Sequence, residues 1–271
     1  MFIFVFPIPL LVGTTRLLDL ARKNNCKNFV YASSSSVYGS SPKEVLAEDD
    51  IVDNPVSPYA ATKKSCELLA YTFNHLYGLP CTGLRFFTVY GPRGRPDMAP
   101  FKFIDRVYKG KTIQQYGDGT TSRDYTYISD IVSGVVAAID RPHAYEVINL
   151  GNGRPFKLKN FIDLVEKCVG KNANIELMPE QPGDVKHTCA SIEKAKVLLG
   201  YSPQVTFEEG IMRTTEWYKL AAKDGIFDEP VEKAQFGASG PGIKRTLSDL
   251  ELSSYVKATP KQVTKRDRRI F

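Results

Sequence analysis

A tyrosine and a lysine four residues apart could move a proton on and off a bound hydroxyl group. Tyr59 and Lys63 enclose the sequence Tyr-Ala-Ala-Thr-Lys, within a stretch rich in helix-forming residues. Residues four apart share one face of a helix, so the phenol and the ammonium group would be neighbours. A positive charge beside a phenol lowers the phenol pKa from about 10 toward neutrality. Tyr59 is therefore a candidate general base, although on spacing alone an exposed helical pair without a role is commoner.

A run of hydroxyl side chains upstream favours the catalytic interpretation. Residues 33–36 are four serines, and they follow a β-favouring run at 28–32 that we expect to be a buried strand. In open α/β sheets, ligands bind at the carboxyl ends of the strands. Serine hydroxyls at that edge could hydrogen-bond the reacting oxygen of a ligand.

Strands and helices are predicted to alternate along most of the chain. Ser57-Pro58 favours a helix start, and Gly78 an end, for a helix at 59–75. The other expected helices are 13–25, 101–108, 129–140, 158–169, 192–199 and 207–220, and the expected strands are 28–32, 81–87, 112–116 and 146–150, with a short one before residue 129. This alternation predicts an α/β fold with a doubly wound parallel sheet.

Both ends of the chain differ in composition from its middle. Residues 1–12 are apolar but too short to span a membrane, and they lack the basic leading region of a secretory signal. From residue 226 to 271, periodicity fades and Gly, Pro, Ser and Lys dominate, so we expect a disordered tail. Residues 257–271 carry most of the formal net charge of +6. A basic tail could touch nucleic acid or an anionic membrane, but a solvated tail is favoured and no nucleic-acid binding is expected.

The cysteines and histidines do not form a metal-ligand pattern. Five cysteines lie far apart, and the chain has only three histidines. This usage predicts reduced thiols, a cytoplasmic location and no metal site.

Five motifs follow one another in a specific order between about residues 13 and 220. They are VYASSSSVYG, SPYAATKK, LRFFTVYGPRGRPDM, SRDYTYISDI and QPGDV. In this order they resemble the extended short-chain dehydrogenases/reductases of the NAD-dependent epimerase/dehydratase family. The resemblance implies that Ser34 supplies a catalytic hydroxyl, Tyr59 is the general base, and Lys63 binds the nicotinamide ribose and lowers the pKa of Tyr59. Phe86 is a further expected cofactor contact.

The residues beside Ser34 most resemble those of UDP-glucuronate 4-epimerases. Ser35 and Ser36 stand where related dehydratases and decarboxylases carry acids, and their hydroxyls could hold a substrate carboxylate. The resemblance implies further substrate contacts at Thr88, Arg95, Tyr116, Arg123, Gln181 and Asp184. Arg123 would bind a diphosphate, and its alternative role is a salt bridge with Asp124 or Asp118. For Arg95, a structural role in its loop is the alternative.

The resemblance implies NAD-dependent 4-epimerisation of UDP-glucuronate to UDP-galacturonate through a 4-keto intermediate, with NAD held tightly. Two alternatives stay open. One is a UDP-glucose/galactose 4-epimerase or a related UDP-sugar-modifying reductase. The other is a catalytically inactive remnant that binds a UDP-sugar or a partner protein. A homodimer through the helix at 59–75 is also expected.

One departure from the family concerns the cofactor. The family's GxxGxxG turn, whose backbone amides receive the NAD pyrophosphate, is not found, and similarity begins at about Gly13. We therefore expect a partial Rossmann-type sheet in a truncated epimerase domain at 13–225, with a smaller C-terminal α/β substrate-binding lobe built mainly from 88–130 and 152–220. Weak or no NAD binding by this chain alone is predicted.

Overall fold

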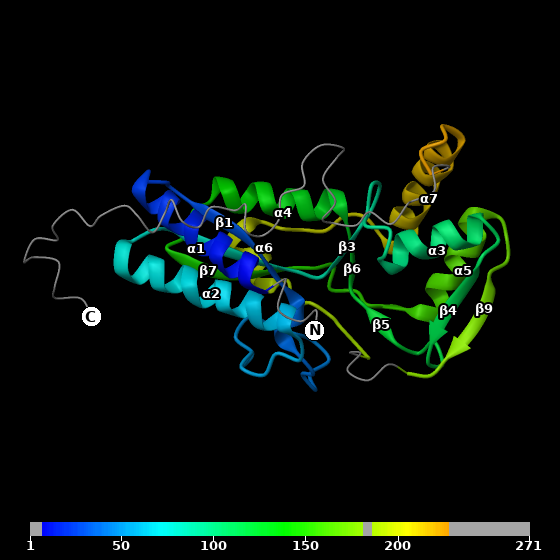
Figure 1. Cartoon of the computed structure of the whole chain (residues 1–271), viewed down its shortest axis with the longest axis horizontal. Helices are drawn as coiled ribbons and strands as arrows, with labels where there is room; N and C mark the ends of the chain where they lie inside the picture. Colours follow the sequence, from blue (N-terminus) through cyan, green and yellow to red (C-terminus); the bar gives the residue numbers. More distant parts are fainter. Residues whose placement is uncertain (1–6, 181–185, 228–271) are drawn as a thin grey trace, which may run out of the picture. The chain divides into compact units, whose positions relative to one another are not determined.

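The strand that carries the serines lies beside two later strands in one parallel sheet. The computed structural model describes residues 7–180 and 186–227. Within them, β1 (Phe29–Ser34) pairs with β2 (Cys81–Phe86), and β2 pairs with β7 (Tyr145–Leu150), all in parallel. The serine end of β1 therefore lies at the same edge of the sheet as the carboxyl ends of β2 and β7 (Figure 1).

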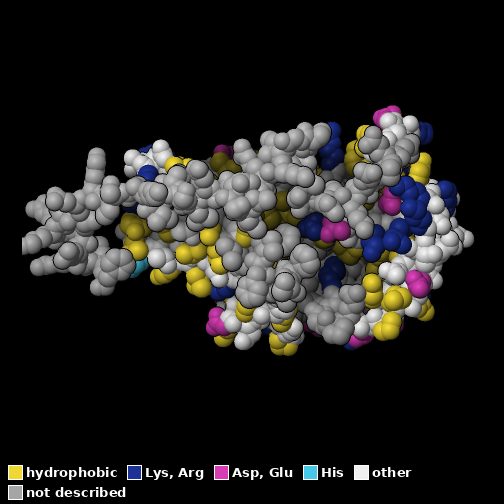
Figure 2. Space-filling model, in the orientation of Figure 1, with side chains coloured by type: hydrophobic (Ala, Val, Ile, Leu, Met, Phe, Trp, Pro, Cys, Tyr) yellow, Lys and Arg dark blue, Asp and Glu magenta, His cyan; other side chains and the backbone are white. Residues whose placement is uncertain are grey.

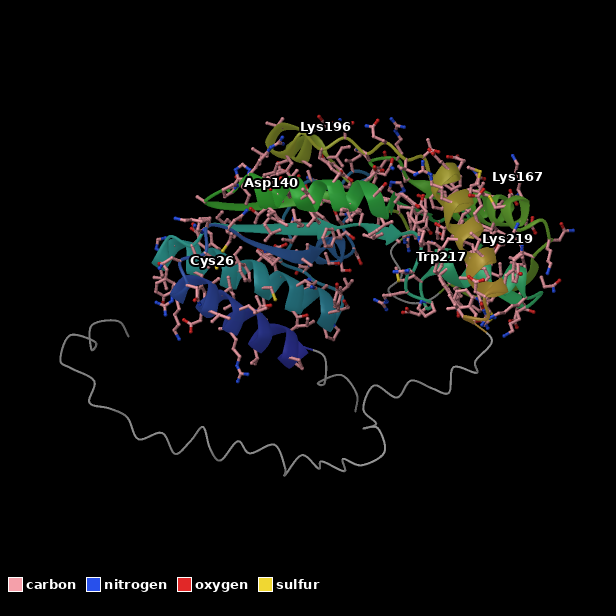
Figure 3. All side chains as sticks on the ribbon, turned by 90° about the horizontal axis from the view of Figure 1, so that it is seen from above. Cys26, Asp140, Lys167, Lys196, Trp217 and Lys219 are labelled. Atoms are coloured by element: carbon pink, nitrogen blue, oxygen red, sulfur yellow. The ribbon has the colours of Figure 1, made fainter. Side chains whose placement is uncertain are left out.

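Helices pack on both faces of this sheet. In chain order they are α1 (Pro7–Lys23), α2 (Pro58–Tyr77), α4 (Ile128–Asp140) and α6 (Glu193–Leu199). The first two cover one face and the last two the opposite face (Figure 3). Leu18 and Ala70 are buried in the first layer, and Ile131 and Ile148 in the second. A parallel sheet needs apolar cover on both faces, so the doubly wound sheet predicted from the sequence is confirmed.

Short strand pairs and further helices form a second, smaller α/β lobe. The strand pairs are β3 (Thr88–Tyr90) with β6 (Tyr125–Tyr127), β4 (Thr112–Tyr116) with β9 (Asn174–Met178), and β5 (Ser122–Arg123) with β8 (Phe156–Lys157). The helices are α3 (Ala99–Tyr108), α5 (Leu158–Val169) and α7 (Phe207–Lys223). Aromatic rings fill the space between them: Phe207 lies 4.7 Å from Tyr125 and 5.1 Å from Phe161, centroid to centroid. All these elements belong to the compact unit of residues 1–226.

The helix that carries Tyr59 has the ends that its sequence predicts. The Ser57 side chain accepts a hydrogen bond from the Ala60 amide at 3.1 Å, and Pro58 occupies the first turn. Gly78 ends the helix in the left-handed conformation, with φ of 67°. A capping hydroxyl and a glycine that tolerates positive φ fix both boundaries of α2.

Other boundaries differ from the prediction. The first helix begins at Pro7 rather than at residue 13, because the first turn of a helix tolerates proline where its missing amide would have no partner. The strands β3, β5, β8 and β9 were not predicted; β3 spans only three residues, β5 and β8 span two each, and β9 is mostly exposed. The disordered basic tail predicted for residues 226–271 lies outside the described residues beyond residue 227.

Exposed apolar side chains gather on α1 and α2. Figure 2 shows apolar side chains, in yellow, over the region of α2. The residues concerned are between 53 and 56% exposed and comprise Leu17, Leu20, Leu68, Tyr71 and Leu76. In the described part of the chain, none of the helices combines the length and the hydropathy needed to cross a membrane.

Candidate active site

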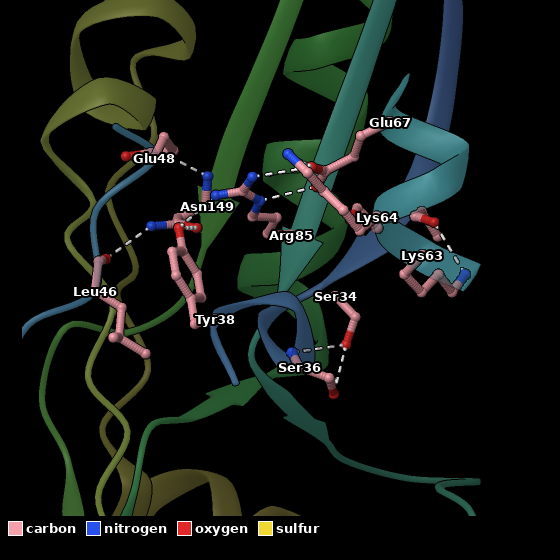
Figure 4. A network of polar contacts seen from close by, with 12 residues as sticks. Ser34, Ser36, Tyr38, Leu46, Glu48, Lys63, Lys64, Glu67, Arg85 and Asn149 are labelled. Atoms are coloured by element: carbon pink, nitrogen blue, oxygen red, sulfur yellow. Dashed lines mark hydrogen bonds and ion pairs between the residues drawn. The ribbon is translucent and has the colours of Figure 1, made fainter. Parts of the chain in front are cut away.

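The candidate catalytic serine ends β1 and begins a tight turn. Ser34 is 8% exposed and caps the 3-10 helix η1 (Ser35–Tyr38). Its Oγ accepts a hydrogen bond from the Ser36 amide at 3.2 Å and donates one to Ser36 Oγ at 3.0 Å (Figure 4). The serine run therefore leaves the sheet as a compact turn that presents hydroxyl groups at the carboxyl edge. This Ser34–Tyr38 segment is called the serine turn below.

The candidate base and its lysine lie in the first two turns of α2. The Lys63 ammonium lies 5.7 Å from the centroid of the Tyr59 ring, and it donates a hydrogen bond to the Ala32 carbonyl at 3.0 Å. That bond fastens the start of α2 to the last residues of β1. Tyr59 itself is 49% exposed, so its phenol is open to a ligand. The structure thus fastens Lys63 to the strand that ends in Ser34, and Tyr59 lies one helical turn before Lys63 on α2.

A cavity of about 300 Å³ lies beside the serine turn. Four of the predicted substrate contacts line it: Ser35, Ser36, Thr88 and Arg123. They come from η1, β3 and β5, which are far apart in sequence. None of the described residues that line this cavity is acidic. Hydroxyl groups and one guanidinium group therefore dominate its polar wall, a composition suited to an anionic ligand.

Four further polar residues that line the cavity were missed as contacts by the sequence reasoning. Ser57, predicted only to begin a helix, lines the cavity, as do Ser41, His187 and Thr188. The Nδ1 atom of His187 lies 2.5 Å from Ser122 Oγ, beside Arg123 in the chain. For His187 and Thr188, the only signal in the sequence was their position a few residues after the QPGDV motif. That position does not predict where either side chain points.

The predicted contact Arg95 lies in an exposed loop. Its side chain is 74% exposed and donates two hydrogen bonds to Asp97, at 3.1 and 2.5 Å. The bond and charge of Asp97 raise the pKa of the Arg95 guanidinium, with a smaller contribution from Tyr59. Arg95 is therefore held by Asp97, two residues along the same loop.

The remaining predicted contacts lie apart from the cavity wall or outside the described residues. Tyr116 ends β4, half-buried, opposite Met178 of β9, and is not among the cavity-lining residues. Phe86 ends β2 beside Ser34 in register and packs partly buried against the core. Gln181 and Asp184 fall in the stretch 181–185, which lies outside the described residues.

The alternative ion-pair partners of Arg123 have other contacts. Asp124 is fully buried, and its carboxylate accepts hydrogen bonds from the backbone amides of Asn152, Gly153 and Ala190 at 2.7 to 2.9 Å. These three bonds join the residue between β5 and β6 to two distant loops. Asp118 accepts the amide of Thr120 at 2.9 Å.

A family model described as "NAD dependent epimerase/dehydratase family" matches residues 10–151, more than half of the chain. The chain belongs to this family. The prediction made from the five motifs is confirmed. Within the epimerase/dehydratase family, the chain is 49% identical over 211 residues to the UDP-glucuronate 4-epimerase of Thermodesulfobacterium geofontis. The match covers 77% of this chain and 64% of that protein, so the chain spans just under two thirds of this relative's length.

Solved epimerase structures share the fold. A UDP-glucuronic acid 4-epimerase from Bacillus cereus, in complex with UDP-glucuronic acid and NAD, superposes with a TM-score of 0.74 at 37% identity, covering 78% of this chain and 67% of that one. A UDP-N-acetylglucosamine 4-epimerase from Methanobrevibacter ruminantium, in complex with UDP-N-acetylmuramic acid, gives 0.73 at 31% identity, covering 78% and 68%. Epimerases of different substrates thus resemble this chain almost equally in fold, so the fold does not choose the sugar.

The family name implies NAD, and part of the structure fits it. An ammonium group has three donors, and Lys63 gives one to Ala32, which leaves others for the hydroxyls of a ribose at the same edge. The pyrophosphate needs a glycine-rich turn between a strand and a helix. The described residues contain no such turn, and the helix before β1 is preceded by no described strand. The nicotinamide end of the cofactor is therefore the end that these residues fit.

Proposed function

We propose that this protein serves in the NAD-dependent 4-epimerisation of a nucleotide sugar, with UDP-glucuronate as the substrate and UDP-galacturonate as the product. The observation that carries the proposal is the hydrogen bond from Lys63 to Ala32, because it fastens the Tyr59 helix to the strand that ends in Ser34. A base, a cation and a hydroxyl donor then meet at the carboxyl edge of the sheet, where ligands of such sheets bind.

In this proposal Tyr59 accepts the proton of the C4 hydroxyl group. The nearby Lys63 ammonium stabilises the negative charge that Tyr59 carries when it acts as a base, and Ser34 donates a hydrogen bond to the C4 oxygen. NAD, when bound, supplies the chemistry of taking the C4 hydride and returning it to the other face of the 4-keto sugar. Tyr59 returns the proton at the end, so the residues recover their starting state.

The choice of a uronic acid rests on the polar wall of the cavity. Ser35, Ser36 and Thr88 can donate hydrogen bonds to a sugar carboxylate, and no described residue of the wall places a second negative charge beside it. Arg123, which also lines the cavity, suits a diphosphate because its planar fork of donors matches phosphate oxygens. UDP-glucose would leave the three hydroxyls without an anionic partner, which makes it the weaker substrate in this proposal.

The proposed assembly is a homodimer in which α1 and α2 of two copies pack together. Leu68, Tyr71 and Leu76 lie within one broad stripe of α2, and each is more than half exposed. Apolar patches of this kind on one helix pair favour self-association. Sedimentation of the wild-type chain and of a Leu68→Glu variant would test this, since a dimer should become a monomer.

A cytoplasmic location is proposed from the five scattered free cysteines.

A second candidate function is binding of a UDP-sugar without turnover. It is favoured by one observation, the lack of a glycine-rich turn between strand and helix in the described residues. The two functions differ in their requirement for NAD, because a binding protein would hold UDP-glucuronate equally well with or without it.

The experiment that separates these proposals combines turnover with binding. UDP-glucuronate and NAD are incubated with the protein, the products are separated by anion-exchange chromatography, and binding is measured by calorimetry. Conversion to UDP-galacturonate is expected, with Tyr59→Phe lowering turnover by about 10² to 10⁴-fold while the dissociation constant changes little. UDP-xylose as the main product would contradict the proposed reaction. Binding without conversion would establish the second function.

A further inference from the structure

A row of buried polar side chains crosses the central sheet just below its carboxyl edge. Ser33, Arg85 and Asn149 are in-register neighbours on β1, β2 and β7, one residue before each strand ends. They are at most 3% exposed. Apolar residues would fill these positions at lower desolvation cost, so a polar row in the middle of a doubly covered sheet requires an explanation.

A carboxylate from the catalytic helix completes this row. Glu67 of α2 is 1% exposed and accepts two parallel hydrogen bonds from Arg85, both of 2.9 Å. Ser33 Oγ donates a third, of 2.6 Å. Burial disfavours the Glu67 carboxylate, but the bonds and charge of Arg85 outweigh it, so the pKa of Glu67 is lowered. Glu67 and Arg85 are therefore a fully formed, buried ion pair.

The other end of the pair reaches the serine turn. Arg85 Nη1 donates a hydrogen bond to the Tyr38 hydroxyl at 3.0 Å, and its guanidinium lies 4.8 Å from the Tyr38 ring centroid. Tyr38 in turn donates to Asn149 at 2.7 Å. Since Tyr38 is the last residue of η1, the guanidinium bonds to both α2 and the turn that begins at Ser34 (Figure 4).

The helical spacing places Glu67 under the reacting groups. Tyr59, Lys63 and Glu67 follow one another at intervals of four, so they lie along one face of α2. Any sliding or rotation of α2 that moved Tyr59 would also break the two-pronged bond to Arg85. Replacing a buried ion pair by apolar side chains is often neutral or stabilising, so stability alone does not account for this one.

We propose that Glu67 and Arg85 are positioning residues, whose ion pair fixes the distance between the serine turn and the Tyr59–Lys63 turn of α2. The expected effect on turnover rests on the proposed epimerase function. The expected effect on the position of α2 rests on geometry alone. Neither residue is among those that line the cavity. A displacement of about 1 Å between reacting groups can lower a rate about 100-fold, so a loose α2 should affect turnover before it affects binding.

The decisive variant removes both charges together, because a single change leaves an unpaired buried charge that can prevent folding. In the double variant Glu67→Met with Arg85→Met, unfolding by urea should occur near the wild-type midpoint, and UDP should bind with a dissociation constant close to that of the wild type. Turnover of UDP-glucuronate should fall about 100-fold. Tyr218→Phe is the control, because it removes a partly buried 2.6 Å bond to Asp105 between α7 and α3, and neither residue lines the cavity.

A second measurement tests the positioning role even if the wild-type protein does not convert UDP-glucuronate. In the double variant, amide hydrogen exchange should quicken in peptides covering the serine turn, including the Gly39 amide that bonds to Ser36 O at 3.1 Å. The Tyr218→Phe control should leave those peptides unchanged. An inactive wild type with this exchange pattern would refute the proposed function and retain the positioning role. Wild-type exchange in the double variant, or wild-type turnover at unchanged stability, would overturn the positioning role.

Discussion

The substitution Glu67→Gln should cost this protein a large part of its stability. The amide keeps the size of the carboxyl group, but its NH2 group must face an N–H of Arg85 across one of the two 2.9 Å contacts. Arg85, only 3% exposed, is left as a buried charge without a counter-charge. Breaking a buried pair in this way typically costs about 3 to 5 kcal/mol. Domains are stable by about 5 to 15 kcal/mol, so the variant should be near the limit of folding.

The cost should depend on pH with a defined sign. The pKa of Glu67 is lowered in the folded state from its ordinary 4.5, against the effect of burial, by the bonds and charge of Arg85. A lowered folded-state pKa gives stability that is fully present above the unfolded-state value and is lost as the pH falls through the folded-state value. The difference between wild type and Glu67→Gln should therefore be constant from pH 8 to about pH 6 and should shrink below about pH 4.5.

Urea unfolding followed by circular dichroism at several pH values measures this difference. Glu193→Gln is the matched control, because Glu193 also bonds a cation, Lys196, at 2.6 Å but is 75% exposed. Its loss should be below about 0.5 kcal/mol at any pH. A loss under about 1 kcal/mol for Glu67→Gln at pH 7, or a loss that grows as the pH falls, would refute the reasoning about the buried pair.

Three further changes test the cap of α2, the backbone at Gly39 and the ion pair of Asp50. Ser57→Ala removes the cap of α2 and should lower stability by about 1 kcal/mol in urea unfolding, with Ser57→Thr retaining most of it. Gly39→Ala should lower stability clearly more than Gly78→Ala. Both glycines have positive φ, but a Cβ at residue 39 would lie 2.5 Å from the Asn54 carbonyl oxygen, whereas nothing lies within 4 Å of a Cβ at residue 78. Equal losses of stability in calorimetry would contradict this. Lys43→Met removes the cation that bonds to the Asp50 carboxylate, so it should lower stability at pH 7 and lower it less at pH 4, as acid titration followed by fluorescence would show.

The elements that could be predicted are those whose ends are determined by residues close to them in the sequence. The boundaries of α2 follow from Ser57, Pro58 and Gly78, which act through their own backbone and side-chain bonds. The amphipathic helix α5 was predicted with the bounds that it has, because its apolar residues recur at helical spacing and become its buried face. The strand β9 could not be found, since an exposed edge strand carries no alternation of apolar and polar residues.

The site could be predicted in its motifs but not in its supports. Tyr59 and Lys63 are recognised by their spacing, and the serine run by its composition. The role of Arg85 depends on register, since only pairing of β1 with β2 brings it beside Ser33 and opposite Glu67. An arginine next to the end of a largely apolar strand was a signal that a buried partner exists, although the sequence did not identify that partner. His187 needed the fold itself, because its contact with Ser122 joins residues that only tertiary structure brings together.

The cavity beside the serine turn has a consequence for folding kinetics. Its walls come from segments at residues 35–57, 88, 123 and 187–188, so no single stretch of chain can form it. Contacts between distant residues form slowly, because closing long loops is entropically unfavourable before the contacts compensate for it. The cavity should be among the last features to appear during refolding. Binding of a ligand such as UDP would then detect only the native state. It would not detect an intermediate that has its helices but lacks the cavity.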